Sequence, residues 1–452
     1  MNIKHKIAAK LPAARERASR LIKDHGSFKI ADVNVEQIYS GIRGVPIQIS
    51  DISYVDPKEG IRLRGYTIPE VLELLPKAEH SERGERSERS ERSEHSKQSE
   101  YPLLGGLYYL LMTGEIPTPA EAQEVEIEWK VRNNLPEHVF QVLRAMPKYT
   151  HPMTLFSQAI LALQTESIFA RRYYYGIDKQ DYWDIYLQDS LNLTAKLPTI
   201  AANIYNLKYR DGIFVHPDPN LDWAANFAFM LGKPEPEYQD LCRLFLVLHS
   251  DHEGANVSAH ASHLVGSALS DVYFSSSAGI DGLAGPLHGL ANQECLRWLL
   301  EVRRHFDGLP TRAQLAAYLE ERLNAGDLIP GYGHAVLRVT DPRFIAQAEF
   351  AEKHLPEDEL YRLVMLVFEA LPPLLIKQGK AKNPWPNVDA INGALQYHFG
   401  LKEFDFYTVV FGLSRILGLT THVTWSRALG KPIERPKSLT TAILEGMVDH
   451  KG

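Results

Sequence analysis

The chain contains little cysteine, no excess of basic charge and no apolar run of membrane length. Only two of its 452 residues are cysteines, Cys242 and Cys295, which excludes a disulfide framework and is typical of a reducing compartment. The net charge of -7 excludes the strongly basic face that nucleic-acid-binding proteins carry. The apolar run at residues 103–112 is too short to cross a bilayer. We therefore expect neither a nucleic-acid partner nor a membrane partner.

What is present is the composition of a globular protein, 44% hydrophobic and 23% charged, at a length that accommodates two or more domains. Apolar residues repeat at the spacing of a helix face, as at Leu241, Leu244 and Leu248. The basic stretch at residues 1–23 has the charge of a transit peptide, but its amphipathic spacing and Glu16 favour a helix of the mature protein. These patterns predict an all-α fold.

Three segments depart from the simple helical pattern. Residues 45–55 alternate between apolar and polar side chains and predict a strand or small hairpin. Residues 358–371 predict a helix that Pro372 and Pro373 end. Residues 80–100 repeat Ser-Glu-Arg with nothing apolar to bury, which predicts a Ser/Glu/Arg-rich surface loop; a partner-binding tail is the alternative.

Four polar stretches between the predicted helices hold side chains capable of chemistry. They are GLAGPLHGLANQE at 282–294, PGYGHAVLRVTDPR at 330–343, GKAKNPWPNVDAING at 379–393 and HSDHEGANVSAHASH at 249–263. Functional groups often lie on such junctions. In the first stretch, His288 precedes a predicted helix start, where unpaired backbone N–H groups are positive and favour a neutral imidazole.

Two neutral histidines and a carboxylate can together form a carbon–carbon bond. The carboxylate, such as Asp389, removes a proton beside a carbonyl, and a histidine such as His288 stabilises the enolate oxygen. A second histidine, such as His334, polarises the carbonyl that the enol attacks. Arginines near it, Arg338 and Arg343, bind the carboxylates of an acidic substrate.

The rival interpretation is the metal site of a zinc hydrolase. The potential ligands are His249, Asp251, His252, Glu253, His260 and His263. The sequence contains neither a His-Glu-x-x-His helix nor cysteine pairs, so the prediction is that no metal is bound.

Taken together, the four stretches resemble citrate synthases, and they are similar to the animal mitochondrial type more than to the shorter bacterial type. The resemblance extends from VDPKEGIRLRGYTIPE at 55–70 to WSRALGKPIERPKS at 425–438. It implies an all-α, two-domain homodimer that condenses oxaloacetate with acetyl-CoA to citrate and CoA and needs no cofactor. Synthesis of 2-methylcitrate from propionyl-CoA is the alternative.

The resemblance also implies domain bounds and site residues. The large domain would comprise 1–289 and 395–452, the small domain 290–394, with the active site in the cleft between them. The short N-terminal stretch favours a bacterial cytoplasm as the location, with the mitochondrial matrix as the alternative.

By the same resemblance, His288 would hydrogen-bond the thioester oxygen, Asp389 would take the methyl proton and His334 would polarise the ketone of oxaloacetate. The residues implied to bind oxaloacetate are His252, Arg343, Arg415 and Arg435, the last reaching the partner subunit's site. The residues implied to contact CoA are Arg43, Gly331, Gly333, Lys380 and Lys382. Two positions depart from the family pattern, Lys179 where a CoA-phosphate arginine is expected and Ile391 beside the base.

Overall fold

The computed structural model describes residues 2–79, 98–379 and 381–449. Most of the Ser-Glu-Arg tract and Lys380 therefore lie outside the described residues. The last three residues of the tract, 98–100, are part of strand β5 and not of a loop.

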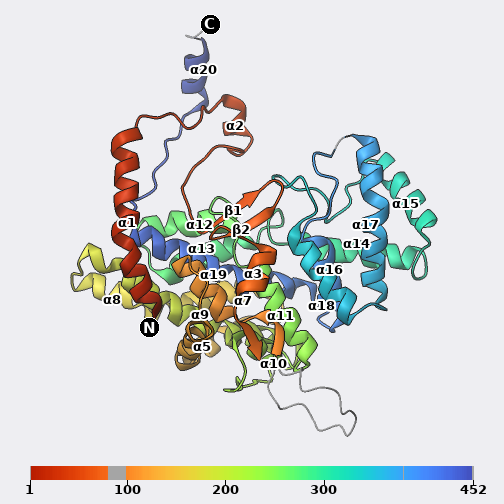
Figure 1. The fold of residues 1–452 in the computed structure, drawn as a ribbon, viewed down its shortest axis with the longest axis horizontal. Helices are drawn as coiled ribbons and strands as arrows, with labels where there is room; N and C mark the ends of the chain where they lie inside the picture. The colour runs from red at the N-terminus through yellow and green to blue at the C-terminus, as the bar shows by residue number, and fades with distance from the viewer. Residues whose placement is uncertain (1, 80–97, 380, 450–452) are drawn as a thin grey trace.

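The described residues are mostly helical, and the helices fall into two groups that lie beside each other in Figure 1. The larger group comprises α1 (Asn2–His25), α2 (Val35–Tyr39), α3 (Ile68–Leu74), α4 (Leu104–Thr113), α5 (Pro119–Arg132), α6 (Glu137–Ala145), α7 (Pro152–Ala162), α8 (Ile168–Tyr174), α9 (Tyr182–Tyr209), α10 (Trp223–Met230), α11 (Pro236–Leu248), α12 (Val257–Ser267), α13 (Val272–Leu283), α19 (Tyr407–Ala428) and α20 (Thr441–Asp449). The smaller group comprises α14 (Ala291–His305), α15 (Arg312–Asn324), α16 (Pro342–His354), α17 (Glu359–Gln378) and α18 (Asp389–His398). Single-turn 3-10 helices are η1 (Leu163–Glu166), η2 (Lys179–Asp181) and η3 (Phe404–Phe406).

Two small antiparallel sheets complete the described fold. They are β1 (Ser53–Asp56), β2 (Gly60–Leu63) and β3 (Tyr66–Thr67) in one sheet, and β4 (Lys77–Glu79) and β5 (Gln98–Pro102) in the other. In the first sheet Ser53 pairs with Leu63. The prediction of an all-α fold class is therefore confirmed, with strands confined to short hairpins.

The core of the larger group forms around α9 and α19, which pack against each other. Both helices are buried around nearly their whole circumference, which is why their sequences are apolar on every side. One polar pair joins the two helices, Ser190 Oγ with Thr424 Oγ1 over 3.2 Å, and other buried polar side chains such as Thr194 and Thr420 bond to Trp129 and Tyr108. No helix among the described residues has both the length and the apolar character needed to cross a membrane.

The smaller group packs mainly within itself, α14 and α17 against α18 and α15 against α17. The small domain predicted at 290–394 covers this group except for the end of α18, which continues to His398. A boundary at residue 394 would cut that helix, so the group itself ends four residues later. The division into two domains stays a prediction.

The predicted helix end at Pro372 and Pro373 is wrong, because α17 runs through both prolines to Gln378. Proline removes a backbone donor from a helix and normally disrupts it. Here Leu371 and Pro372 are buried in the interface of the smaller group, and this packing outweighs the local preference. The helix ends instead at Gly379, whose φ of +69° gives the left-handed cap.

The predicted strand at 45–55 forms only from Ser53 onward. Its alternating polar residues bond to other segments of the chain. Gln48 donates to the Gly254 carbonyl, and the Ser50 hydroxyl contacts His422. This segment therefore covers a loop of the larger group and makes no ladder of its own.

Candidate active site

His288 lies in the turn between α13 and α14 and not at a helix start. α14 begins at Ala291, and the backbone N–H of His288 donates to the Gly285 carbonyl within the turn (3.0 Å). The imidazole faces the first turn of α12, where the Ser258 N–H donates to Nε2 over 3.3 Å. That N–H belongs to the first turn of α12, where backbone donors lack helical partners, so the helix N-terminus that faces His288 is that of α12 and not that of α14.

His288 Nε2 faces two groups of Ser258, the backbone N–H at 3.3 Å and Oγ at 3.1 Å. Because the backbone N–H can only donate, we assign the acceptor role to Nε2 and the proton to Nδ1. Nδ1 makes no hydrogen bond within the described part of the chain and is free to donate. Burial, with a smaller contribution from the Arg415 guanidinium, lowers the pKa of His288 to about 4, so the ring is neutral at pH 7.

His334 has the opposite tautomer. The N–H groups of Val336 and Leu337 both donate to its Nδ1 over 3.0 Å, which leaves the proton on Nε2. Burial, and then the charge of Arg343, lowers the pKa of His334. Its ring lies 5.6 Å from the ring of His252, centroid to centroid. The rings of His252 and His334 therefore lie side by side, and His334 has a defined tautomer.

The loop before His334 is joined to the loop before Asp389 by backbone hydrogen bonds. Gly333 N donates to the Trp385 carbonyl (3.2 Å), and Asn387 N donates to the Gly331 carbonyl (2.9 Å). Gly331 has a φ of +80°, and a Cβ there would lie 2.8 Å from Ala390 Cα, so only glycine fits. The two glycines predicted to contact CoA thus have a structural role in fixing these loops to each other.

Asp389 is the first residue of α18, and its carboxylate does not cap that helix. Val388 holds the N-cap position, and the carboxylate accepts no hydrogen bond from any described residue. Burial raises the pKa of Asp389 to about 6, against the opposing charge of Arg343 and with support from Asp341. An unpaired carboxylate of raised pKa is suited to accept a proton.

Two arginines are buried beside these groups, Arg343 at 4% exposure and Arg415 at 1%. Arg343 is paired with Asp341, whose Oδ2 lies 2.7 Å from Nη2. Arg415 donates to the His249 carbonyl (3.2 Å) and to Ser258 Oγ (3.0 Å) but forms no ion pair with a described residue. Burial lowers its pKa to about 10, so it is still charged at pH 7. A buried cation without a carboxylate partner favours an anionic ligand.

The electrostatic influence of Arg343 links the residues that the sequence proposed separately. Its charge acts on the pKa of Asp389, His334 and His252, and the charge of Arg415 acts on that of His288. The structure therefore brings together His288, His334, Asp389, His252, Arg343 and Arg415.

The remaining charged residues of the prediction are not among these buried groups. Arg43, Lys382 and Arg435 are exposed, and Lys380 falls outside the described residues. Arg435 follows Glu434, which accepts a 2.9 Å contact from His260 Nε2 and thus ties the segment to α12. Their assignment as CoA or substrate contacts stays a prediction.

The histidines proposed as metal ligands have other partners. His249 stacks on Phe245 at 4.1 Å, and its Nδ1 contacts the carbonyl of that residue. His260 and His263 face Glu434. No group of three or more His, Cys, Asp or Glu residues suited to a metal ion exists among the residues that the structure describes.

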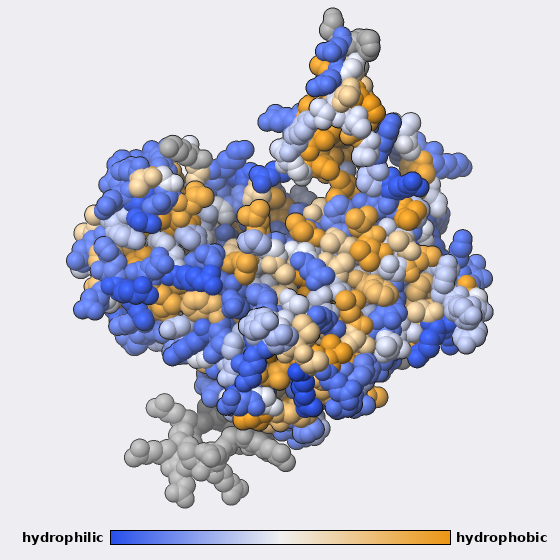
Figure 2. All heavy atoms as spheres, turned by 180° about the vertical axis from the view of Figure 1, so that it is seen from behind, coloured by the Kyte–Doolittle hydropathy of each residue, from blue (hydrophilic) through white to orange (hydrophobic). Residues whose placement is uncertain are grey.

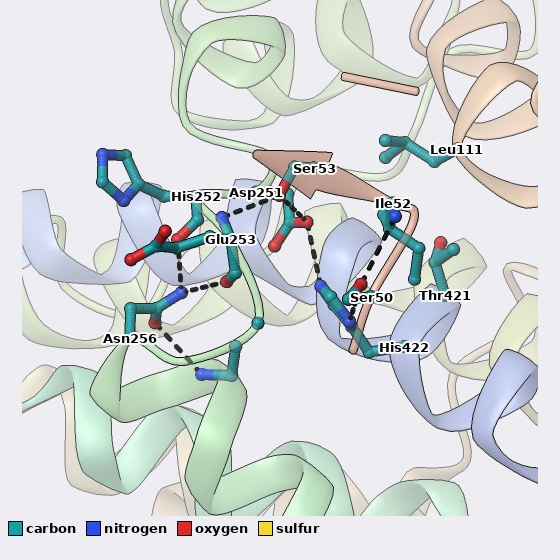
Figure 3. Close-up of polar contacts among 12 residues, drawn as sticks. Ser50, Ile52, Ser53, Leu111, Asp251, His252, Glu253, Asn256, Thr421 and His422 are labelled. Carbon is teal, nitrogen blue, oxygen red and sulfur yellow. Dashed lines mark hydrogen bonds and ion pairs between the residues drawn. The ribbon is translucent and has the colours of Figure 1, made fainter. Parts of the chain in front are cut away.

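Sequence reasoning missed four polar residues around the site, which are Ser53, Asp251, Asp341 and His422. Asp341 could have been predicted as a helix cap, because Asp-Pro at a helix start is typical of an N-cap. It does cap α16. Asp251 was considered only as a metal ligand; it instead contacts Ser53 and His422, as Figure 3 shows. Ser53 and His422 are too far away in sequence for any local pattern to reveal them.

Comparison with known proteins gives a consistent result across nearly the whole chain. The family model described as "Citrate synthase, C-terminal domain" matches residues 41–437. A probable mitochondrial citrate synthase of Glossina morsitans morsitans is 49% identical over 98% of this chain and 91% of its own length. The mitochondrial citrate synthase of Xiphias gladius is 48% identical over 100% and 92%. The crystal structure of citrate synthase from Pyrobaculum aerophilum superposes with a TM-score of 0.75 at 27% identity, covering 89% of this chain and 92% of that one.

The expected location in a bacterial cytoplasm is wrong. The relatives that match over nearly full length are named as mitochondrial proteins of eukaryotes. The basic, amphipathic N-terminal stretch carries no information on compartment, because a helix that packs on the body of the protein has the same pattern.

Proposed function

This chain belongs to the citrate synthase family, and we propose that the cluster around Arg343 and Arg415 condenses oxaloacetate with acetyl-CoA to citrate and CoA. The chain is accordingly an acyltransferase of the citrate (Si)-synthase class. Its relatives are named citrate synthases, and nothing in them points to 2-methylcitrate synthesis. Their names also support a mitochondrial location.

The observation that carries the proposal is a pair of neutral histidines with free N–H groups beside an unpaired carboxylate. His288 offers Nδ1–H, and His334 offers Nε2–H. Asp389 offers a carboxylate whose pKa is raised to about 6. These are one base and two hydrogen-bond donors, the number that an enolisation followed by an addition requires.

In the first step Asp389 takes a proton from the methyl group of acetyl-CoA, and the C–H electron pair moves into the forming C=C bond. His288 donates from Nδ1 to the thioester oxygen, where negative charge develops. In the second step the enol carbon attacks the ketone carbon of oxaloacetate, and His334 donates from Nε2 to the ketone oxygen. Water then hydrolyses the citryl thioester and releases CoA.

The anionic substrate is held by the buried cations. Arg343 and Arg415 bind carboxylates of oxaloacetate, and His252, beside the ring of His334, hydrogen-bonds the substrate. Closure of the smaller group of helices over the larger one excludes water before condensation. The proposed CoA contacts are Arg43, Gly331, Gly333, Lys380 and Lys382.

The working unit is a homodimer in which Arg435 reaches the partner subunit's site. In Figure 1, α20 and the segment around α2 project from the body, and Figure 2 shows apolar side chains over this projection. Large hydrophobic residues that are exposed on these two arms are Phe28, Ile30, Val33, Val35, Ile38, Tyr39, Ile42, Ile47, Ile49, Ile433, Leu439, Ile443, Met447 and Val448. So many on two extended arms favour burial against a second copy.

Subunit mixing tests this arrangement. A His288→Ala homodimer and an Arg435→Ala homodimer should each be nearly inactive. Their mixture should recover activity, because one site of each mixed dimer holds both native residues. The measurement is CoA release after denaturation and refolding together, with mixed dimers counted by mass spectrometry. If mixed dimers form and no activity returns, Arg435 acts within its own chain.

The raised pKa of Asp389 predicts an acid limb in the pH profile. Below about pH 6 the carboxyl is protonated and cannot accept a proton, so kcat/KM for acetyl-CoA should fall about tenfold per pH unit. His288 adds no second limb there, since its pKa is lowered to about 4. Initial rates at saturating oxaloacetate measure the profile. A flat profile down to about pH 5 would argue against Asp389 as the base.

A further inference from the structure

We infer that Ser53 and His422 are positioning residues, which aim His252 at the substrate by holding the residues on both sides of it, Asp251 and Glu253. The inference rests on the proposed role of His252 as an oxaloacetate ligand. Figure 3 shows the arrangement, in which β1 and α19 meet the loop between α11 and α12.

One hydroxyl group clamps both neighbours of His252. Ser53 Oγ donates to Asp251 Oδ2 over 2.6 Å and accepts from the backbone N–H of Glu253 over 2.7 Å. The Asp251 carboxylate before His252 and the peptide N–H after it are thus bound to the same atom on β1. The bond to Asp251 is buried and the bond to Glu253 is partly buried, so a displaced partner would be poorly satisfied.

The imidazole of His252 has no hydrogen bond of its own within the described chain. Among the described residues its ring lies beside the ring of His334. The orientation of the ring is therefore set by the backbone on either side of it. The hydrogen bonds from Ser53 to Asp251 and Glu253 thus affect oxaloacetate binding as well as stability.

The backbone at Glu253 needs external support. Its φ of +55° lies in the left-handed region, which is unfavourable for a residue with a Cβ. Asn256 Nδ2 contacts the carbonyls of His252 (2.8 Å) and Glu253 (2.7 Å) from within the loop. Ser53 supplies the contact from outside, so the loop conformation is fixed from two directions.

His422 contacts the same Asp251 carboxylate from α19. Its Nε2 lies 2.9 Å from Asp251 Oδ2, and its Nδ1 lies 3.3 Å from Ser50 Oγ. His422 lies on α19 seven residues after Arg415, two turns along the same face, and Arg415 Nε donates to the His249 carbonyl. One face of a rigid, buried helix therefore fixes this loop at two points.

Asp251 stays ionised in this setting. Burial alone would favour the neutral acid, but His422, the Ser53 hydroxyl and Arg415 outweigh it and lower the pKa of Asp251. A charged acceptor strengthens both hydrogen bonds to it.

The expected effect is a loss of oxaloacetate affinity. Ser53→Ala and His422→Phe should each raise the oxaloacetate Kd about 5- to 10-fold, the usual size of coupling within one hydrogen-bond network. His422→Gln keeps a neutral donor toward Asp251 and should restore binding to within about 2-fold of the native protein. Isothermal titration of the dimeric protein with oxaloacetate measures each Kd, and kcat at saturating substrates should change far less than KM.

A matched control separates positioning from stability. Ser157→Ala removes a buried hydroxyl that contacts Ser277 Oγ over 2.8 Å, between α7 and α13 and away from the loop. It should lower the melting temperature about as much as Ser53→Ala and leave the oxaloacetate Kd unchanged. If Ser53→Ala behaves like this control, Ser53 has only a structural role and the inference fails.

A double-mutant cycle tests whether the effect passes through His252. In a His252→Ala background, Ser53→Ala should change the oxaloacetate Kd less than about 2-fold, because nothing is left to position. An undiminished effect there would overturn the inference while leaving the role of His252 intact. No effect of His252→Ala itself would overturn the proposed function of His252, and the inference with it.

Discussion

Replacing Asp389 by asparagine is expected to lower kcat by about 10³-fold or more, because the carboxylate proposed as the base is lost. Asparagine keeps the shape and cannot take the methyl proton. Oxaloacetate affinity should stay close to native, since Arg343 and Arg415 are unchanged. The direct measurement is the exchange of acetyl-CoA methyl protons into deuterated water, with a stable oxaloacetate analogue bound; exchange should disappear in the variant.

The melting temperature of the same variant distinguishes a base from a structural residue. The folded-state pKa of Asp389 is raised above its value of 3.8, so the stability it contributes is full below pH 3.8 and is lost as the pH rises through about 6. At pH 7 a neutral asparagine removes this cost, and the variant should melt no lower than the native protein. Near-normal exchange combined with a lower melting temperature would show that the base lies elsewhere.

Replacing His288 by alanine is expected to lower kcat by about 10²- to 10⁴-fold. In the proposed mechanism Nδ1–H donates to the enolate oxygen, and without it the enol would not be stabilised. Methyl-proton exchange should therefore be lost as well. The Ser258 N–H, which now donates to His288 Nε2, would have to find water instead.

His334→Ala is the matched control for His288→Ala. It removes a second neutral imidazole, but one assigned to the ketone and not to the thioester. It should abolish condensation and keep exchange of the methyl protons. The ketone stretching frequency of bound oxaloacetate is expected to be higher in this variant than in the native protein, because the polarising donor is lost. Equal loss of exchange in both variants would contradict the separate roles of the two histidines.

Much of the site could be predicted from the sequence because its residues lie in compact motifs. His288, His334 and Asp389 each lie in a short glycine- and proline-rich stretch between apolar helices. In the structure the charge of Arg343 acts on the pKa of His334 and Asp389, and the charge of Arg415 acts on that of His288. The helix whose N-terminus faces His288 was predicted wrongly. The pattern pointed to α14, which follows in sequence, whereas the N-terminus that faces the ring is that of α12.

What the sequence could not reveal depends on contacts between distant segments. Ser53 and Asp251 are 198 positions apart, and His422 and Asp251 are 171 positions apart. No local periodicity encodes such pairs. The continuation of α17 through Pro372 and Pro373 could not be predicted for the same reason. Burial against other helices of the smaller group overrides a local signal that normally ends a helix.

In the proposed function this site makes citrate from oxaloacetate and acetyl-CoA. A direct assay compares kcat/KM for acetyl-CoA and for propionyl-CoA, each with saturating oxaloacetate, and identifies the products by mass spectrometry. One methylene in a pocket discriminates by about 10- to 200-fold. We expect acetyl-CoA to be preferred by a factor in this range, with citrate as the product. A preference for propionyl-CoA with 2-methylcitrate as the main product, or the absence of any condensation product, would contradict the account.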